Sequence, residues 1–334
     1  MFNFVKKIQM ARILTGIQST GTPHLGNILG AIMPAMELAN DAKNESFLFI
    51  ADLHSLTQIK DAEILKSNTY ATAATWLAFG LDPEKTVFYR QSDVPQVTEL
   101  AWHLLCFFPF NRLSLATSFK DKADRLEDVN AGLFSYPILM AADILIYDAE
   151  LVPVGKDQLQ HLEITRDVAS RFHAKMGETF VLPKDLVQEN TKLVPGTDGE
   201  KMSKSRGNFI DIFASEKDLK KQVMSIETAS TPLEEPKDPD ACNVYNLYKL
   251  IASEKQNQAI REKYLAGGFG FGHAKLALLD LLLERFEAER KTFTFYMNDV
   301  SKIDEVLKLG AEKAAVVANG VLQRVRGKLG LLVK

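Results

Sequence analysis

Cysteine, long apolar runs and an excess of either charge are all scarce in this chain of 334 residues. Its 2 cysteines, Cys106 and Cys242, lie too far apart for a disulfide framework and lack the spacing of metal ligands. No apolar run approaches the roughly 20 residues that a membrane-spanning helix needs, so we expect no membrane association. The net charge of -3 gives no general attraction for a polyanion, so an RNA partner must be held by local basic patches.

The remaining composition is that of an ordinary folded protein, with 46% hydrophobic and 25% charged residues. The length exceeds what one hydrophobic core usually serves, which favours two domains or one domain with a large insertion. Residues 1–9 lack the apolar core and cleavage site of a secretory signal, and we expect a dispensable extension there. The expected location is the cytoplasm.

β-rich runs and helical stretches alternate through the first half of the chain, which predicts a parallel sheet wrapped by helices. The expected strands are residues 12–17, 47–51, 87–91 and 151–154, with a helix over 61–79. One proline and three glycines among charges predict a mobile loop over 190–208. Helical periodicity follows over 215–225, 244–265, 275–293 and 303–325. The sequence therefore predicts an α/β fold with a second, all-helical domain.

The segment TGIQSTGTPHLGN, residues 15–27, follows the first expected strand and opens a helix. Thr22 is the expected cap of that helix and Pro23 its first residue. Unpaired N–H groups at such a helix start suit a phosphate chain, and Gly21 and Gly26 let a nucleotide approach the backbone closely. A capped helix after an ordinary glycine-containing turn is the plainer reading of any one of these residues.

A second signal, KMSKS at residues 201–205, lies inside the expected loop. Lys201 and Lys204 can close over a triphosphate and neutralise the charge that grows on departing pyrophosphate. Either lysine alone would more simply be a solvated surface residue. Together with His24 and Asn27, expected as donors on one helical face, they predict a nucleotide site.

HLGN at residues 24–27, followed far downstream by KMSKS, resembles the signature pair of class I aminoacyl-tRNA synthetases. Within that class the chain is similar to the bacterial tryptophanyl-tRNA synthetases. The similar segments are GIQ at 16–18, MAAD at 140–143, and PVGKDQ at 153–158 followed by His161. The resemblance covers nearly the whole chain, from about Arg12 onward.

The resemblance implies a Rossmann-like catalytic domain over residues 11–210, with a helical insertion near 95–135. It also implies an anticodon-binding helical domain over 211–300 and a C-terminal helix over 301–334 that packs back on the catalytic domain. The implied substrates are L-tryptophan, ATP with Mg²⁺, and tRNA(Trp). Tryptophan is first activated to tryptophanyl-AMP and is then transferred to the tRNA. Family members are usually homodimers, and the apolar segment 104–115 is the expected contact surface.

The functional positions of the family carry over onto three groups of residues. The catalytic group is Lys201, Lys204, His24 and Asn27. The ATP-binding group is Gln18, Ser19, Thr20, Gly26, Asn27, Lys120, Asp157, Lys201, Met202, Ser203, Lys204 and Ser205. The substrate-binding group is Leu14, Thr15, Gly16, His54, Tyr136, Met140, Asp143 and Gln158. Mg²⁺ is expected on the ATP phosphates, with no protein metal site. The basic residues expected near RNA are Lys217, Lys220, Lys221, Arg324, Arg326, Lys328 and Lys334.

Specificity for tryptophan can be argued at one helix. Tyr136, Met140 and Asp143 recur at the spacing of one helical face, with Pro137 expected to start the helix. Asp143 lies in an apolar run, where an ionised carboxylate needs a donor, and an indole N–H is one such donor. A structural Asp143, paired with an arginine or a backbone amide, is the alternative. Gln158 is expected to open the next helix.

Two residues depart from the family pattern, in which many bacterial members have proline at Ser19 and an aromatic residue at Leu14. The first change predicts a looser turn, and the second removes an aromatic wall from the indole pocket. The competing readings are a tyrosyl-tRNA synthetase, a small nucleotidyltransferase with an HxGH element, and a non-catalytic paralogue that senses tryptophan or RNA. KMSKS argues against the first and the helical second half against the second. The intact signature residues argue against the third.

Overall fold

The computed structural model describes residues 10–115, 129–155, 158–187 and 194–331. The expected extension at residues 1–9, together with Lys120, Asp157 and Lys334, lies outside the described residues. The strands are β1 Ala11–Ile17, β2 Asn44–Ile50, β3 Val87–Arg90, β4 Leu151–Val154 and β5 Lys184–Val187. The helices between them are α1 Leu25–Asn27, η1 Ile28–Ile32, α2 Met33–Asn40, α3 Asp52–Ser55, α4 Ala62–Ala78, η2 Gln91–Asp93, α5 Gln96–Phe107, α6 Phe110–Leu113, α8 Ala131–Leu145 and α9 Leu159–Met176. After the sheet come α10 Glu216–Met224, α11 Asn243–Ile251, α12 Glu254–Ala266, α13 Phe271–Arg285, α14 Glu287–Asn298 and α15 Ser301–Leu329.

The strands form one parallel sheet in the order β3-β2-β1-β4-β5, which confirms the expected α/β fold. The chain builds outward from β1 to β3 and then returns to the other side of β1 for β4 and β5. This reversal opens a crevice beyond the carboxyl ends of β1 and β4, the place where open parallel sheets bind ligands. The sequence does not predict β5, because KDLV at a sheet edge has neither an apolar run nor an alternating pattern.

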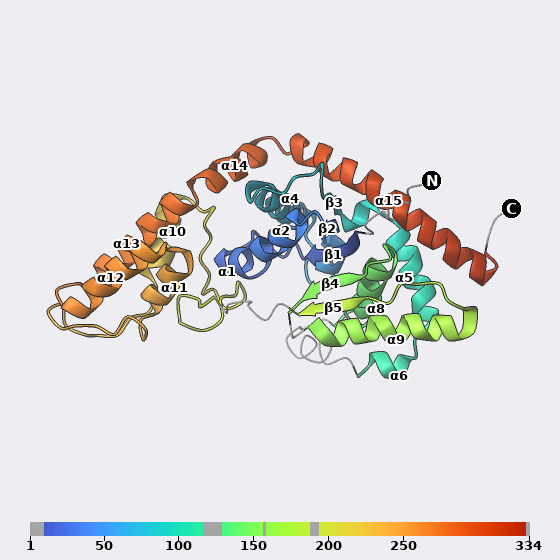
Figure 1. Cartoon of the computed structure of the whole chain (residues 1–334), viewed down its shortest axis with the longest axis horizontal. Helices are drawn as coiled ribbons and strands as arrows, with labels where there is room; N and C mark the ends of the chain where they lie inside the picture. The colour runs from blue at the N-terminus through green and yellow to red at the C-terminus, as the bar shows by residue number, and fades with distance from the viewer. Residues whose placement is uncertain (1–9, 116–128, 156–157, 188–193, 332–334) are drawn as a thin grey trace, which may run out of the picture.

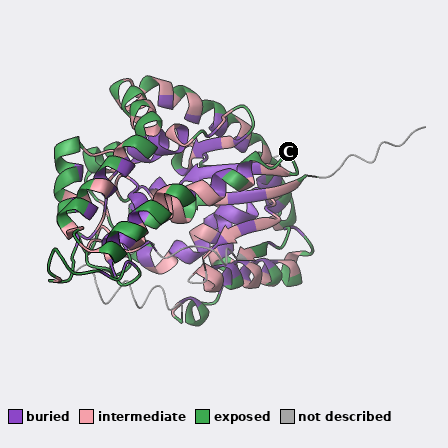
Figure 2. Ribbon diagram, turned by 60° about the vertical axis from the view of Figure 1, so that its left-hand side comes forward, coloured by how far each residue is buried: buried purple, intermediate pink, exposed green. Residues whose placement is uncertain are grey.

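Helices cover both faces of the sheet, and the strands are largely buried between them (Figure 2). On one face, Leu48 and Ile50 of β2 pack in a cluster with residues of α2 and α4. On the other face, Leu14 and Phe49 pack in a cluster with residues of α5, α8 and α9. Because side chains alternate along a strand, neighbouring residues of β2 serve opposite faces.

Helices α10–α13 lie to one side of the sheet, and α14 leads from them to α15, which runs back along the sheet (Figure 1). α14 packs against α4, and α15 packs against β3. Gly310 of α15 sits where a Cβ would overlap the backbone carbonyl of Phe88, so only glycine permits this close approach. None of the helices in the described part of the chain is long and apolar enough to cross a membrane.

Two of the helices expected from periodicity are each two helices in the structure. The expected helix at 244–265 is interrupted at Ser253, which caps α12 through a capping box with Gln256. The expected helix at 275–293 is interrupted at Phe286, which is buried at the corner between α13 and α14. The apolar pattern continues through both corners, so periodicity alone does not reveal them.

Candidate active site

A cavity of about 540 Å³ lies beside the carboxyl-terminal halves of β1 and β4. Its volume is in the range of pockets that enclose a small-molecule substrate. All the residues expected to bind the amino acid line this cavity, together with Gln18: Leu14, Thr15, Gly16, His54, Tyr136, Met140, Asp143 and Gln158. Lining residues that the sequence did not indicate include Gly30, Phe49, Ile144 and Val152.

Asp143 reaches the cavity from α8, whose start differs from the expectation. The helix begins at Ala131, and the side chain of Asn130 caps it by accepting from the N–H of Leu133. Pro137 therefore lies inside α8 and does not start it, so the predicted start was wrong. The cap explains the error, because Asn130 satisfies an N–H group at the helix start, which a proline cannot do.

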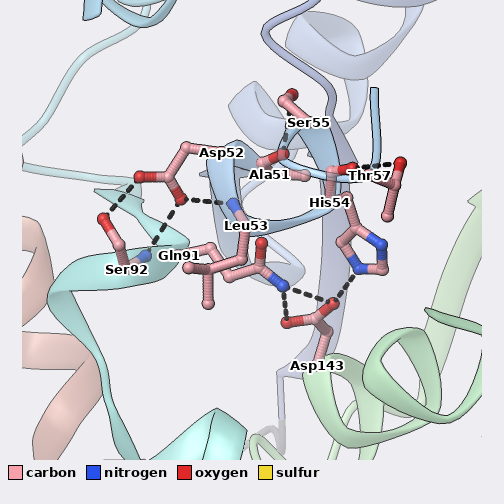
Figure 3. A network of polar contacts seen from close by, with 9 residues as sticks. All are labelled: Ala51, Asp52, Leu53, His54, Ser55, Thr57, Gln91, Ser92 and Asp143. Atoms are coloured by element: carbon pink, nitrogen blue, oxygen red, sulfur yellow. Dashed lines mark hydrogen bonds and ion pairs between the residues drawn. The ribbon is translucent and has the colours of Figure 1, made fainter. Parts of the chain in front are cut away.

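Asp143 is held by donors from two neighbouring strand ends (Figure 3). Nε2 of His54 lies 2.8 Å from Oδ2, and Nε2 of Gln91 donates to Oδ1 at 2.7 Å and to Oδ2 at 2.9 Å. The side chain is only 2% exposed, and this burial raises its pKa while the hydrogen bonds from His54 and Gln91 oppose the rise. The alternative partners, an arginine or a backbone amide, are not those found.

These bonds leave one acceptor position on the carboxylate among the described residues. Oδ2 takes two donors and Oδ1 takes one, whereas each carboxylate oxygen has two lone pairs. Asp143 lines the cavity, so the remaining lone pair of Oδ1 suits a ligand N–H. Gln91 is a residue that sequence reasoning missed, since a single glutamine after a strand carries no distinctive pattern.

A second carboxylate, Asp52, braces the two segments that hold Asp143 (Figure 3). It follows β2 and accepts from the N–H of Ser92 at 3.0 Å and from the Ser92 hydroxyl. Ser92 adjoins Gln91, and Asp52 lies in the same short helix as His54. The Asp52–Ser92 contact therefore fixes the two donors relative to each other.

Tyr136 and His161 form another polar pair in the cavity wall, with 2.8 Å between the phenol oxygen and Nε2. The ring of Tyr136 also meets that of His54 edge-on, with centroids 6.2 Å apart. Gln158, beside this pair, is the N-cap of α9, and Leu159 is the first residue of the helix. The expectation that Gln158 opens the helix is therefore wrong by one position.

The HLGN segment starts a continuous helical run over residues 25–40, with π-helical spacing at 28–32. His24 is the cap, where the sequence suggested Thr22 with Pro23 as the first residue. Nδ1 of His24 accepts from the N–H of Asn27 at 3.2 Å, and Oδ1 of Asn27 accepts from the N–H of His24 at 3.2 Å. The signature residues therefore cap their own helix.

Capping also sets the proton position on His24. Burial, with a smaller contribution from the charge of Lys204, lowers the pKa of His24 to about 4, so the ring is neutral at pH 7. Because Nδ1 accepts a hydrogen bond, the proton of the neutral ring is on Nε2. That N–H is a donor suited to a phosphate oxygen.

The KMSKS segment packs directly on the start of α1. Met202 is buried, and its sulfur accepts from the N–H of Gly26 at 3.3 Å. The N–H of Leu25 donates to the carbonyl of Ile210 at 2.9 Å, just beyond the segment. The two signature motifs, far apart in the sequence, are thus in contact.

Asn208 organises the irregular segment around KMSKS and was missed by sequence reasoning. Its buried side chain accepts from the N–H of Ser203 at 2.7 Å and donates to Asp198 at 2.7 Å. It also donates to the carbonyl of Lys201 at 3.2 Å. The described residues of this loop form no helix, and mobility of the loop stays a prediction.

The two signature lysines have different surroundings. Lys201 is exposed, whereas Lys204 is half-buried beside the turn that precedes α1. A Cβ on Gly21 would overlap Nζ of Lys204, and Gly21 has a φ of 143° that favours glycine. Burial lowers the pKa of Lys204 to about 8, against the opposing effect of the Asp211 carboxylate.

Ser19 does not turn its side chain toward the cavity. Its hydroxyl is fully buried and lies 3.2 Å from the hydroxyls of both Ser55 and Thr69. These hydrogen bonds anchor the turn, which we expected to be looser because Ser19 replaces the proline of many family members. Thr20 is exposed beside it. No cluster of three or more His, Cys, Asp and Glu residues suited to a metal occurs in the described part of the chain.

A parallel sheet with an HLGN helix start and a KMSKS segment packed together near its carboxyl edge defines a class I aminoacyl-tRNA synthetase. The family model for class I tRNA synthetases of tryptophan and tyrosine matches residues 6–287. The tryptophan–tRNA ligase of Campylobacter jejuni is 45% identical over 320 residues, covering 96% of this chain and 100% of that protein. That of Fusobacterium nucleatum is 47% identical over 325 residues, covering 97% and 99%.

Solved structures agree with the sequence relatives. The Campylobacter jejuni tryptophanyl-tRNA synthetase, complexed with ADP and tryptophan, superposes with a TM-score of 0.93 and covers 96% of this chain and 100% of its own. The enzyme from Mycoplasma pneumoniae, 28% identical, gives a TM-score of 0.79 and covers 97% and 98%. This chain belongs to the bacterial tryptophanyl-tRNA synthetase family.

Proposed function

We propose that this protein is a tryptophan–tRNA ligase that works in the cytoplasm in two steps. In the first step the tryptophan carboxylate attacks the α-phosphate of ATP, which forms tryptophanyl-AMP and releases pyrophosphate. In the second step a terminal ribose hydroxyl of tRNA(Trp) attacks the activated carbonyl, which forms the ester and releases AMP. The observation that carries this proposal is the continuity of the two sites along one segment: residues 14–16 line the cavity, and Gly21 contacts Lys204.

The residues around α1 suit a triphosphate. Nε2–H of neutral His24 and the side-chain amide of Asn27 are donors, and the ammonium of Lys204 supplies positive charge. Phosphoryl transfer of this kind depends on positioning and charge stabilisation more than on a protein nucleophile. Mg²⁺ would be held by the phosphates and would neutralise their charge. The roles of Lys120 and Asp157 at ATP remain expectations from the family.

The cavity suits the amino acid. We assign the free acceptor position of Asp143 to the indole N–H, and Tyr136 and Gln158 to the ammonium end of tryptophan. A site built around this hydrogen bond penalises side chains that lack the donor, because Asp143 would then keep an unused acceptor in a buried setting. Tyrosine has a donor too, so the shape of the cavity must exclude it.

For tRNA we propose residues 211–300, which hold the helices α10–α14, as the anticodon-binding part. The basic residues expected to contact RNA in this part are on α10: Lys217, Lys220 and Lys221. Two of the other basic residues are already paired within the chain: Arg324 with Asp148 at 2.6 Å and Arg326 with Glu99 at 2.5 Å. Those two residues hold α15 in place, so we remove them from the proposed RNA contact.

We also propose a homodimer formed through α5 and α6. Trp102, Phe110 and Leu115 are 66%, 70% and 61% exposed, which is unusual for large apolar side chains grouped in one region. Within the expected segment 104–115, Phe108 is buried and therefore belongs to the core. Sedimentation of the Phe110→Asp variant should show monomers where the parent chain gives dimers, and a dimeric variant would rule this surface out.

The direct test is amino-acid-dependent exchange of labelled pyrophosphate into ATP, run with each of the twenty amino acids. Tryptophan alone should support exchange, and tRNA(Trp) should then be charged. Exchange with tyrosine would reassign the chain to the tyrosyl branch of the same fold. No exchange with any amino acid would favour the non-catalytic paralogue.

A further inference from the structure

The floor of the cavity carries one phenylalanine among its described lining residues, Phe49 of β2. The neighbouring strand β1 contributes Leu14 and Gly16 to the same floor, and neither is aromatic. In the parallel register, Gly16 lies directly beside Phe49. The opposite wall comes from α8, through Met140, Asp143 and Ile144.

The ring of Phe49 is fixed on both flanks. On the β3 side it stacks on Tyr89, with centroids 5.9 Å apart and an interplanar angle of 23°. On the β1 side it extends over Gly16, where a Cβ would lie 3.0 Å from Cε2 and 2.6 Å from Cε1, and closer still to Cζ. Any side chain at Gly16 would force the ring to move. The ring is 7% exposed and lines the cavity, so it is a rigid surface that a ligand can meet without any rearrangement.

We propose that Phe49 is the aromatic wall of the tryptophan side-chain site, and that Gly16 is glycine to give its ring room. This inference rests on the proposed function, in that the cavity holds the side chain of tryptophan. The aromatic surface that the Leu14 position does not offer is supplied from the next strand, two residues further along the same face of the sheet. An indole packed against this ring gains the offset-stacked or edge-to-face contact that aromatic pairs prefer, which a leucine cannot give. Asp143 on α8 then receives the polar edge of the indole while Phe49 receives its apolar surface.

The proposal predicts where the site tolerates extra volume. Phe49→Leu removes ring atoms from the floor and leaves a space next to the indole. Pyrophosphate exchange should be measured with tryptophan and with analogues that carry a methyl group at each benzo-ring position in turn. At one or two of these positions, the kcat/KM of the analogue relative to tryptophan should rise at least about tenfold, since one methyl group in an apolar pocket changes kcat/KM by that order.

Phe47→Leu is the matched control. Phe47 is on the same strand, faces the same core cluster and is also buried, but it packs against Tyr147 outside the cavity lining. Its variant should lose thermal stability to a similar extent and leave the analogue preferences unchanged. An equal shift for both variants, or no shift at any ring position for Phe49→Leu, would overturn the proposal.

The Gly16–Phe49 contact has its own test that does not depend on the analogues. Gly16→Ala should lower kcat/KM for tryptophan by at least about tenfold, because the new methyl group drives the ring into the cavity. In the Phe49→Leu background the same change should have a much smaller effect, as expected for residues that act through one contact. Effects that multiply independently would overturn the contact. Exchange by the parent chain with tryptophan keeps the proposed function standing whichever way these tests fall.

Discussion

The hydrogen bonds from Gln91 to Asp143 should decide how well tryptophan is recognised. Gln91→Leu removes both of these bonds and keeps the size of the side chain, and Gln91 itself is not among the described cavity-lining residues. A hydrogen bond to a charged group contributes about 1.5–3 kcal/mol, so losing the equivalent of one in the complex corresponds to roughly a 10- to 150-fold loss in kcat/KM for tryptophan. The loss should appear mainly in KM, because the reacting carboxylate and ATP are untouched.

The same substitution should also change how kcat/KM and the free energy of unfolding depend on pH. Burial raises the pKa of Asp143, and the hydrogen bonds of Gln91 and His54 counteract that rise. In Gln91→Leu the pKa of Asp143 should therefore rise further, and the acid limb of the kcat/KM profile for tryptophan should move to higher pH. The lost stability should be largest above the pKa of Asp143, where the carboxylate is ionised, and should shrink as the pH falls and it becomes protonated. Denaturant unfolding across pH measures this.

Gln96→Leu is the control for this experiment. It makes the same chemical change nearby, but Gln96 bonds to Asn319 of α15, away from the cavity. The reasoning about Asp143 is refuted if Gln91→Leu leaves both KM for tryptophan and the acid limb where they are in the parent chain and in Gln96→Leu.

Three further predictions concern the nucleotide side and the fold. Because the pKa of Lys204 is about 8, kcat/KM for ATP should fall as the pH rises from 7 to 9. Lys204→Arg stays charged and should flatten this fall, whereas an unchanged pH dependence of kcat/KM in the variant would show that another group titrates. Asn208→Ala should lower kcat with little effect on KM for tryptophan in pyrophosphate exchange, and a change confined to tryptophan KM would contradict its assigned place. Gly310→Ala should lower the melting temperature, because the new methyl group overpacks α15 against Phe88 and lowers the free energy of unfolding by about 1–3 kcal/mol. Gly320→Ala, in open space on the same helix, should raise the melting temperature. Equal shifts for the two variants would contradict the close contact.

Much of the catalytic part could be read from the sequence, because its signals are local. Strands β1–β4 are apolar runs bounded by turn residues, and the two signature motifs are contiguous segments. The residues assigned to the amino acid also come together in one cavity, as the family resemblance implied. Local patterns of this kind can be recognised without knowledge of the tertiary structure.

The supporting residues could not be read in the same way. Gln91 and Phe49 each act on a partner far away in the sequence, so their importance depends on how the strands are placed side by side. Asn208 bonds to residues within its own irregular loop, whose fold no periodic pattern predicts. A buried phenylalanine in a strand is usually core, and nothing before the structure distinguishes Phe49 from Phe47. Two predicted helix starts were wrong for a related reason. We placed the starts at Pro23 and Pro137, whereas the side chains that cap the two helices are those of His24 and Asn130.

We expect one crevice to hold both the amino acid, beneath α8, and the triphosphate, between α1 and the KMSKS segment. A crystal structure with tryptophan and a non-hydrolysable ATP analogue tests it most directly. We expect the indole nitrogen within hydrogen-bonding distance of Oδ1 of Asp143, and phosphate oxygens in contact with His24 Nε2 and the Lys204 ammonium. Tryptophan outside the cavity, or a triphosphate that contacts neither His24 nor Lys204, would contradict it.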